Sequence, residues 1–123
     1  MTRARQEAGR RGEHAAERHL AHAGYVILAR NYRCALGEID LVALDGRTVV
    51  FVEVKARRTL DFGAPFETVT RGQQQRILRA ADHFCARHGL LDRDQRFDIV
   101  GVCLDGVTPH CELVRGAFEA DGW

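Results

Sequence analysis

Lysine is nearly absent from this chain: Lys55 is the only one, and the other 17 of the 18 basic residues are arginine. A chain with this bias is expected to use arginine wherever only positive charge is needed. Lysine differs because its ammonium group is compact and its pKa shifts readily, whereas a guanidinium group stays charged. Survival of one lysine codon by chance is the alternative. The carboxylates around Lys55 favour a functional role instead.

Other absences restrict the class of protein. The four cysteines form no CxxC pair and no metal-ligand spacing, which indicates free thiols in a reducing compartment. The chain has no apolar run long enough to span a bilayer and no signal-peptide core, so we expect a cytoplasmic protein without a membrane partner. The net charge of +1 does not by itself indicate a nucleic-acid binder. The 123 residues predict one domain over 1–123.

Hydrophobic periodicity and turn residues predict two helices and five strands in the order α-β-β-β-α-β-β. A capping box at Thr70–Gln73 opens the second helix, and a long loop over 56–69 precedes it. This order predicts an α/β domain with a mixed sheet flanked by helices. The predicted helices cover 4–23 and 71–88, and the strands cover 25–29, 37–44, 47–55, 97–104 and 111–114.

The dipeptide Asp45-Gly46 predicts a two-residue hairpin loop between the second and third strands. Leu44 would then pair with Arg47, Asp40 would face Phe51 and Glu38 would face Glu53. Because side chains alternate between the faces of a strand, one polar face and one apolar face result. The polar face carries Glu38, Asp40, Glu53 and Lys55, and the apolar face carries Ile39, Leu41, Val50, Val52 and Val54.

On this register Asp40 and Glu53 are diagonal neighbours, roughly 7–8 Å apart at the backbone. Like charges at such spacing destabilise a sheet, and a hard divalent cation, Mg²⁺ or Mn²⁺, would relieve the repulsion. Bound there, the cation could polarise a phosphoryl group and lower the pKa of a water. Lys55 would orient or deprotonate that water, or neutralise charge on the phosphorus. The alternative is a solvated hairpin face on which Lys55 pairs with Glu53 or Glu38.

Further candidates lie on the two predicted helices and after Lys55. Glu13 follows Gly12, which would let the first helix approach the sheet closely. Asp98 suits a structural role as well as a catalytic one. His19 and His22, at helical i, i+3 spacing without a third ligand, indicate surface residues. We expect the following residues to contact phosphates: Arg57, Arg58, Arg71, Gln74 and Arg76.

Several segments together resemble the YraN family of small bacterial proteins, over nearly the whole chain. The most specific are Gly37-Glu38-Ile39-Asp40-Leu41 and Val50-Phe51-Val52-Glu53-Val54-Lys55. The others are Gly12-Glu13, Gly24-Tyr25, Asn31-Tyr32-Arg33 and Arg96-Phe97-Asp98. The resemblance implies a restriction-endonuclease-like, or PD-(D/E)XK, fold. The order Glu, Asp, Glu-x-Lys, with gaps of 27 and 13 residues, is also similar to archaeal Holliday-junction resolvases.

By this resemblance Glu13, Asp40, Glu53 and Lys55 are the residues of a metal-dependent endonuclease that hydrolyses DNA, and we expect branched or otherwise structured DNA as its substrate. Two departures are notable: Ile39 replaces the proline of the nominal superfamily motif, and Gln73 stands where relatives usually carry lysine. Cutting a junction would favour a homodimer, because two symmetric nicks need two sites. Two rivals stay open, a non-catalytic nucleic-acid-binding module of the same fold and a structural or adaptor protein.

Overall fold

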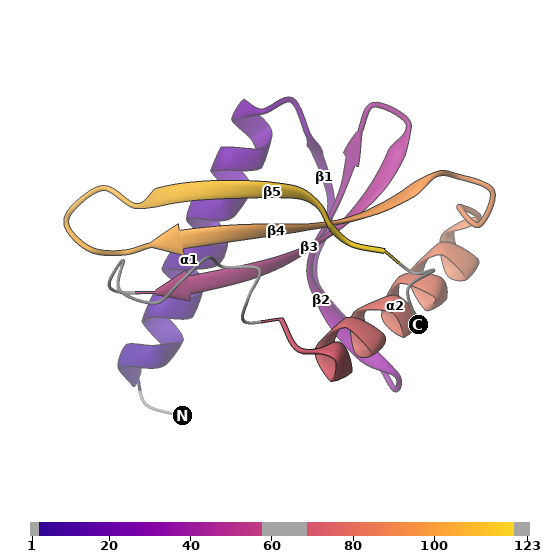
Figure 1. The fold of residues 1–123 in the computed structure, drawn as a ribbon, viewed down its shortest axis with the longest axis horizontal. Coiled ribbons are helices and arrows are strands. Elements are labelled where there is room, and N and C mark those ends of the chain that lie inside the picture. Colours follow the sequence, from indigo (N-terminus) through magenta and orange to yellow (C-terminus); the bar gives the residue numbers. More distant parts are fainter. Residues whose placement is uncertain (1–2, 58–68, 120–123) are drawn as a thin grey trace.

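The computed structural model describes residues 3–57 and 69–119, and these form an α/β fold with a five-stranded mixed sheet between two helices, as predicted (Figure 1). The elements follow the predicted order. They are α1 (Arg3–His22), β1 (Val26–Cys34), β2 (Gly37–Asp45), β3 (Thr48–Arg57), α2 (Arg71–His88), β4 (Gln95–Cys103) and β5 (His110–Phe118). Most of the predicted loop over 56–69 lies outside the described residues, and its first two residues belong to β3.

The sheet has the strand order β1-β2-β3-β4-β5. Strands β3 and β4 are parallel, and every other neighbouring pair is antiparallel. A parallel pair requires a crossover connection, and α2 lies between β3 and β4 in the chain. The predicted capping box is confirmed: the Thr70 side chain accepts the Gln73 N–H, and the Gln73 side chain accepts the Thr70 N–H.

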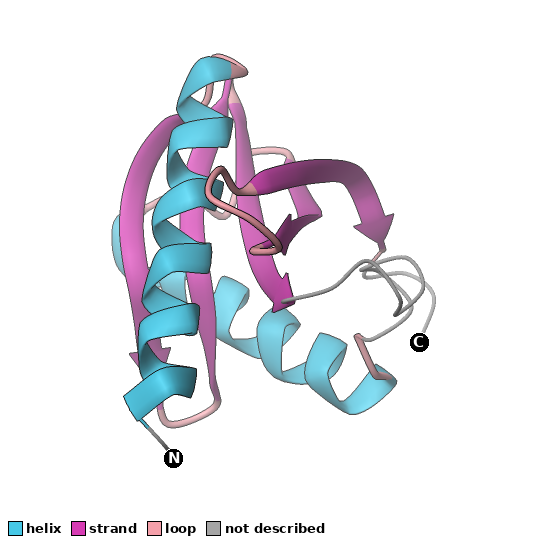
Figure 2. Cartoon of the chain, turned by 90° about the vertical axis from the view of Figure 1, so that its left-hand side faces the viewer, coloured by secondary structure: helices cyan, strands magenta, loops and turns pink. Residues whose placement is uncertain are grey.

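The two helices cover opposite faces of the sheet, and each face has its own hydrophobic cluster. Figure 2 shows α1 running along one face, with α2 lying across the lower part of the other. Ala16 and Leu20 of α1 pack on Leu41, Val50 and Val52. On the other face, Ile77, Ala81 and Phe84 of α2 pack on Val42 and Phe51.

Among residues 3–57 and 69–119, neither helix has the length and apolar character that a bilayer-spanning segment requires.

The predicted register of the β2–β3 hairpin is wrong by two residues. Asp45 pairs with Thr48 and Leu44 pairs with Val49, so the loop is Gly46-Arg47. The reason is that Gly46, with φ of 61°, takes the first loop position, where two-residue loops with glycine first need a positive φ. Phe51 therefore faces Val42 rather than Asp40, and Glu38 does not face Glu53. A shift of two leaves each side chain on its own face, because the side-chain period of a strand is also two.

Three other predictions need correction. Strand β1 continues to Cys34 because it forms a hairpin with β2 that extends to the Cys34–Gly37 pair. Strand β5 is longer than predicted because it pairs along most of β4. Ile39 packs in the α2 cluster and not with Leu41, because strict alternation breaks where β2 curves.

Asp98 is the one fully buried charged residue in the described part of the chain. Its carboxylate accepts the Tyr25 hydroxyl at 2.8 Å, the Arg96 Nε–H at 2.9 Å and the Gly116 N–H at 3.0 Å. A buried carboxylate is tolerated when its oxygens are hydrogen-bonded and paired with a cation. These contacts link the start of β1 to β4 and β5. Asp98 therefore has a structural role in this fold.

Gly12 brings α1 into direct contact with β3, as predicted. A Cβ built on Gly12 would lie 2.5 Å from the Cβ of Ala56, which is attached directly to the strand backbone and cannot rotate away. Any side chain at position 12 would therefore push the helix and the strand apart. This contact also positions Glu13, the next residue of α1, beside the sheet.

We expect Gly12→Ala to lower the free energy of unfolding by about 1–2 kcal/mol, because overpacking outweighs the gain in helix propensity. Gly9→Ala, on the same helix with nothing within 4 Å of the added Cβ, is the matched control and should be stabilising by about 0.5–1 kcal/mol. Urea denaturation measures both. A Gly12→Ala protein as stable as the Gly9→Ala protein would show that the helix does not approach β3 this closely.

Candidate active site

The candidate site lies where β2 and β3 separate. Their pairing ends at Leu41 and Val52, although β2 begins at Gly37 and β3 continues to Arg57. Figure 1 shows β2 curving down toward α2 while β3 continues beside β4. Strand separation exposes backbone groups that would otherwise pair, and polar side chains are needed to satisfy them.

Asp40 occupies the first position beyond the last paired residue of β2. Its Oδ2 accepts the backbone N–H of Val54 at 2.8 Å, so the side chain of one strand bonds the backbone of the other. Continuing this register by one residue places Asp40 level with Glu53. The two residues are therefore nearer to each other than in the diagonal arrangement predicted from the sequence. Asp40 is fixed in place by this bond and is largely buried.

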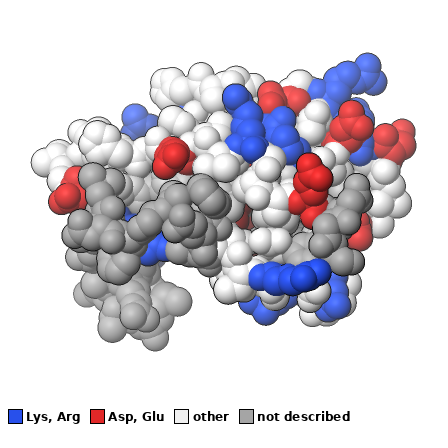
Figure 3. Space-filling model, in the orientation of Figure 1, with Lys and Arg blue, Asp and Glu red and all other residues white. Residues whose placement is uncertain are grey.

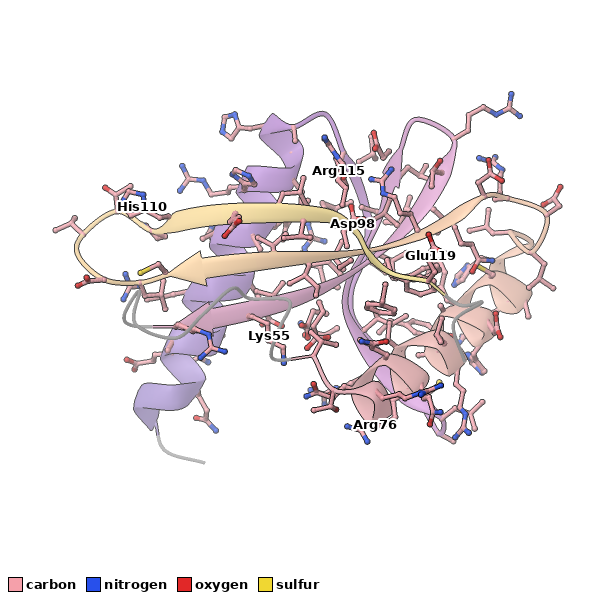
Figure 4. All side chains as sticks on the ribbon, in the orientation of Figure 1. Lys55, Arg76, Asp98, His110, Arg115 and Glu119 are labelled. Carbon is pink, nitrogen blue, oxygen red and sulfur yellow. The ribbon has the colours of Figure 1, made fainter. Side chains whose placement is uncertain are left out.

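Glu53 and Lys55 project from β3 beside Asp40. The Lys55 ammonium nitrogen lies 3.6 Å from Glu53 Oε1, and both side chains are about four-fifths buried, at 19% and 20% exposed. Figure 4 shows Lys55 on β3 and Arg76 on α2 on the same lower side of the molecule. Lys55 thus pairs with Glu53, as the alternative of a solvated hairpin face predicted. The pair lies in a half-enclosed site, however, and not on a solvated face.

The carboxyl groups of this site have raised pKa values. Burial, followed by the negative charge of Asp40, raises the pKa of Glu53 to about 7, although Lys55 opposes the shift. Burial also raises the pKa of Asp40, against the lowering effect of the Val54 N–H. The pKa of Glu13 is raised by burial and then by the charge of Asp40. One lysine therefore leaves the negative charge of the cluster incompletely compensated.

A hollow of about 720 Å³ brings the four predicted catalytic residues together. Glu13 comes from α1, Asp40 from β2, and Glu53 and Lys55 from β3. Arg57, predicted to contact phosphate, lines the same hollow. Residues from a helix and two strands, separated by up to 44 positions along the chain, thus face one space.

The site suits a hard cation held by two carboxylates. Within the described residues, no group of three or more His, Cys, Asp or Glu side chains is arranged to hold a metal ion on its own. Asp40 and Glu53 nonetheless lie level with each other on adjacent strands, and the charge of Asp40 raises the pKa of Glu53. Mg²⁺ is often bound by one or two carboxylates, with water and substrate oxygens completing its shell. The donor chemistry therefore fits Mg²⁺ or Mn²⁺.

The other residues predicted to contact nucleic acid are dispersed. Arg71 is exposed at the start of α2, and Arg58 lies outside the described residues. Gln74 is half-buried and donates to the Val69 carbonyl at 3.3 Å, so its amide contributes to the start of α2 and not to the hollow. Arg76 is exposed and lines a second hollow, of about 400 Å³, which also contains Glu53.

The sequence analysis missed the residues of β1 and its turn that line this second hollow. Arg33, Cys34 and Leu36 lie there, opposite Gln73 and Arg76 of α2. Arg33 belongs to the Asn31-Tyr32-Arg33 segment of the family resemblance, but no motif marks Cys34 or Leu36, because they approach Glu53 only through the curvature of β2. The available signal was the pair of charged residues, Arg33 and Glu38, on either side of the short segment that contains Leu36.

The raised pKa of Glu53 predicts a pH-dependent stability in EDTA. A carboxyl whose pKa is higher in the folded state contributes stability that is present below pH 4.5 and is lost as the pH rises through 7. We expect the free energy of unfolding to fall by up to about 3 kcal/mol between pH 5 and pH 8. Glu53→Gln should remove most of that slope, whereas Glu112→Gln, on exposed β5, should retain it. Equal slopes in all three proteins would contradict the burial of this charge.

Comparison with known proteins identifies the family. The model of "Uncharacterised protein family UPF0102" matches residues 12–102, a segment that contains the four predicted catalytic residues. A UPF0102 protein of Desulfosudis oleivorans is 46% identical over 121 residues, covering 98% of this chain and 97% of its own. A UPF0102 protein of Moorella thermoacetica is 45% identical over 120 residues, covering 96% of this chain and 100% of its own. The chain therefore belongs to the UPF0102 family, the family also named YraN.

Proposed function

We propose that this protein is a metal-dependent endonuclease of restriction-endonuclease-like type that hydrolyses phosphodiester bonds in DNA. The observation that supports this most is the meeting of Asp40, Glu53 and Lys55 at the separation of β2 and β3. Two partly buried carboxylates beside one ammonium group can hold a divalent cation and contact a phosphate at the same time. The resemblance to archaeal Holliday-junction resolvases favours branched or structured DNA as the substrate.

Asp40 and Glu53 would hold Mg²⁺ or Mn²⁺. When bound, such an ion neutralises charge on a phosphate and lowers the pKa of a coordinated water. The Val54 N–H holds Asp40 in a fixed orientation, so the carboxylate would not have to reorganise when the substrate arrives. Glu13, which lines the same hollow from α1, adds a third carboxyl group that can accept a proton or bond a water.

Lys55 would act on the attacking water or on the phosphate that receives it. Its ammonium group is already 3.6 Å from Glu53, so it would hold a water against the metal-binding carboxylates or donate to a phosphate oxygen. A proton transfer by a positioned side chain contributes typically 10²–10⁴-fold to rate. Arginine at this position would keep the charge, but it would not give up a proton near neutral pH.

A nucleic-acid partner is supported by the distribution of arginine around the site. Figure 3 shows Lys and Arg side chains at the lower edge of the molecule, where α2 lies, and a further group at the upper right. Arg57 lines the hollow itself, and Arg76 lines its neighbour. Basic side chains beside the carboxylates suit a polyanion that binds together with a cation.

The direct test is cleavage of duplex, nicked, single-stranded and branched DNA in Mg²⁺, Mn²⁺ or EDTA. We expect cleavage with either metal and none in EDTA. Asp40→Asn should abolish cleavage, whereas Asp82→Asn, exposed on α2, should cleave as the wild type does. Binding of DNA without any metal-dependent cleavage would instead select the non-catalytic module.

Exchange of the only lysine tests its chemical role. We expect Lys55→Arg to lose at least about 100-fold in cleavage rate, as Lys55→Ala does, while still binding DNA. The reason is that arginine keeps the charge but not the compact, exchangeable proton. The matched control, Arg87→Lys at the end of α2, should cleave at the wild-type rate.

Thermal unfolding must show that each variant folds before rates are compared. Near wild-type cleavage by Lys55→Arg would reduce Lys55 to a positive charge that holds phosphate.

A further inference from the structure

The second hollow has walls from two separate parts of the chain. One wall is the β1–β2 turn, with Arg33, Leu36 and Glu38, and the other is the N-terminal half of α2, with Gln73 and Arg76. Glu53 lies in both this hollow and the larger one. A strand whose scissile phosphate lay beside Glu53 would therefore have its neighbouring nucleotide next to this hollow.

The β1–β2 turn packs directly against α2. A Cβ built on Gly37 would lie 2.3 Å from the backbone carbonyl oxygen of Arg76, so the two backbones are in direct contact. No side chain fits between them, and glycine at position 37 permits this close approach. The spacing between the two walls of the hollow is thus set by backbone packing.

The rim of the hollow combines positive charge with an exposed apolar side chain. Leu36 is 52% exposed at the turn, although a residue of this size usually gains about 1.5–3 kcal/mol from burial. Arg33 pairs with Glu38 at 3.2 Å, but both side chains are mostly exposed, so the pair is weak and Arg33 can also bond a phosphate. Arg76 faces it from α2.

We propose that this hollow receives one unpaired nucleotide next to the scissile phosphate, with Arg33 and Arg76 on its phosphate and Leu36 against its base. This inference rests on the proposed nuclease function and adds the substrate class, DNA with an unpaired strand beside the cut. The hollow, of about 400 Å³, is in the range of sites for small molecules and admits a nucleotide but not a duplex.

The preference for unpaired DNA follows from the cost of exposing a base. A nucleotide in a duplex must be unstacked and unpaired before it can enter a pocket, and this cost is lowest for a strand that is already single-stranded. Apolar side chains such as leucine are used elsewhere to hold bases apart at a kink. Leu36 is positioned to do this, while the arginines contribute affinity that is independent of sequence.

The experiment compares binding of two labelled DNAs by fluorescence anisotropy in EDTA, so that no cleavage is needed. One is a duplex, and the other has the same duplex with a forked single-stranded end. We expect the wild type to bind the fork about tenfold more tightly. Leu36→Ala should reduce this ratio to about two, and Leu91→Ala, a leucine that is 62% exposed beyond the end of α2, should leave it unchanged.

Salt dependence tests the arginines separately. Arg76→Gln should weaken binding of both DNAs and reduce the slope of log K against log salt by about one, as loss of one phosphate contact predicts. Arg87→Gln, in the last turn of α2, should leave the slope unchanged. Melting curves confirm that Leu36→Ala and Arg76→Gln are folded.

The two proposals can fail independently. A wild type that prefers the fork through Leu36 but cleaves nothing with Mg²⁺ or Mn²⁺ supports the hollow and overturns the nuclease. A wild type that cleaves duplex and fork equally, with equal affinity, overturns the hollow and keeps the nuclease. Equal fork-to-duplex ratios for Leu36→Ala and the wild type would also overturn the role of the hollow.

Discussion

The hydrogen bond from the Val54 N–H to the Asp40 carboxylate is the contact on which the candidate site depends. It satisfies a backbone donor that β3 would otherwise expose where β2 departs. With this donor satisfied, β2 can curve toward α2 while β3 continues beside β4. Glu53, at this branch, lines both hollows. The hydrogen bond at the end of the β2–β3 pairing thus also holds the Asp40 carboxylate beside Glu53.

Close contacts at two glycines pack the helices against the sheet near the point where β2 and β3 separate. Gly12 lets α1 meet Ala56 of β3, and Gly37 lets the β1–β2 turn meet Arg76 of α2. Each helix therefore contacts the sheet next to a charged residue of the site, Glu13 in one case and Glu38 in the other. Burial is the largest cause that raises the pKa values of Glu53 and Asp40; the charge of Asp40 adds to the rise at Glu53, and the charge of Glu38 adds to the rise at Asp40. Binding of a cation, or protonation of a carboxyl group, is therefore favoured over a site in which these carboxylates are charged and have no bound cation.

The sequence predicted the fold class and the face shared by Asp40, Glu53 and Lys55, because both depend on periodicity. The register error of the hairpin was harmless for the same reason: a shift of two residues preserves the face. Ile39 was placed on the wrong face because strict alternation assumes a flat strand, and β2 curves. The lengths of β1 and β5 depend on backbone pairing with β2 and β4, which the hydrophobic pattern of one strand does not record. The second hollow was unpredictable because Arg33 and Arg76 come to line one space only through tertiary packing.

The central claim is that Asp40 and Glu53 form a cation site at the branch of the sheet, and crystals soaked in Mn²⁺ test it directly. Anomalous diffraction should show one peak between the two carboxylates, at oxygen distances of roughly 2.0–2.2 Å by analogy with Mg²⁺. Crystals of Asp40→Asn soaked in the same way should lack that peak and keep the strand separation. A peak elsewhere, or the same peak without the Asp40 carboxylate, would contradict the account.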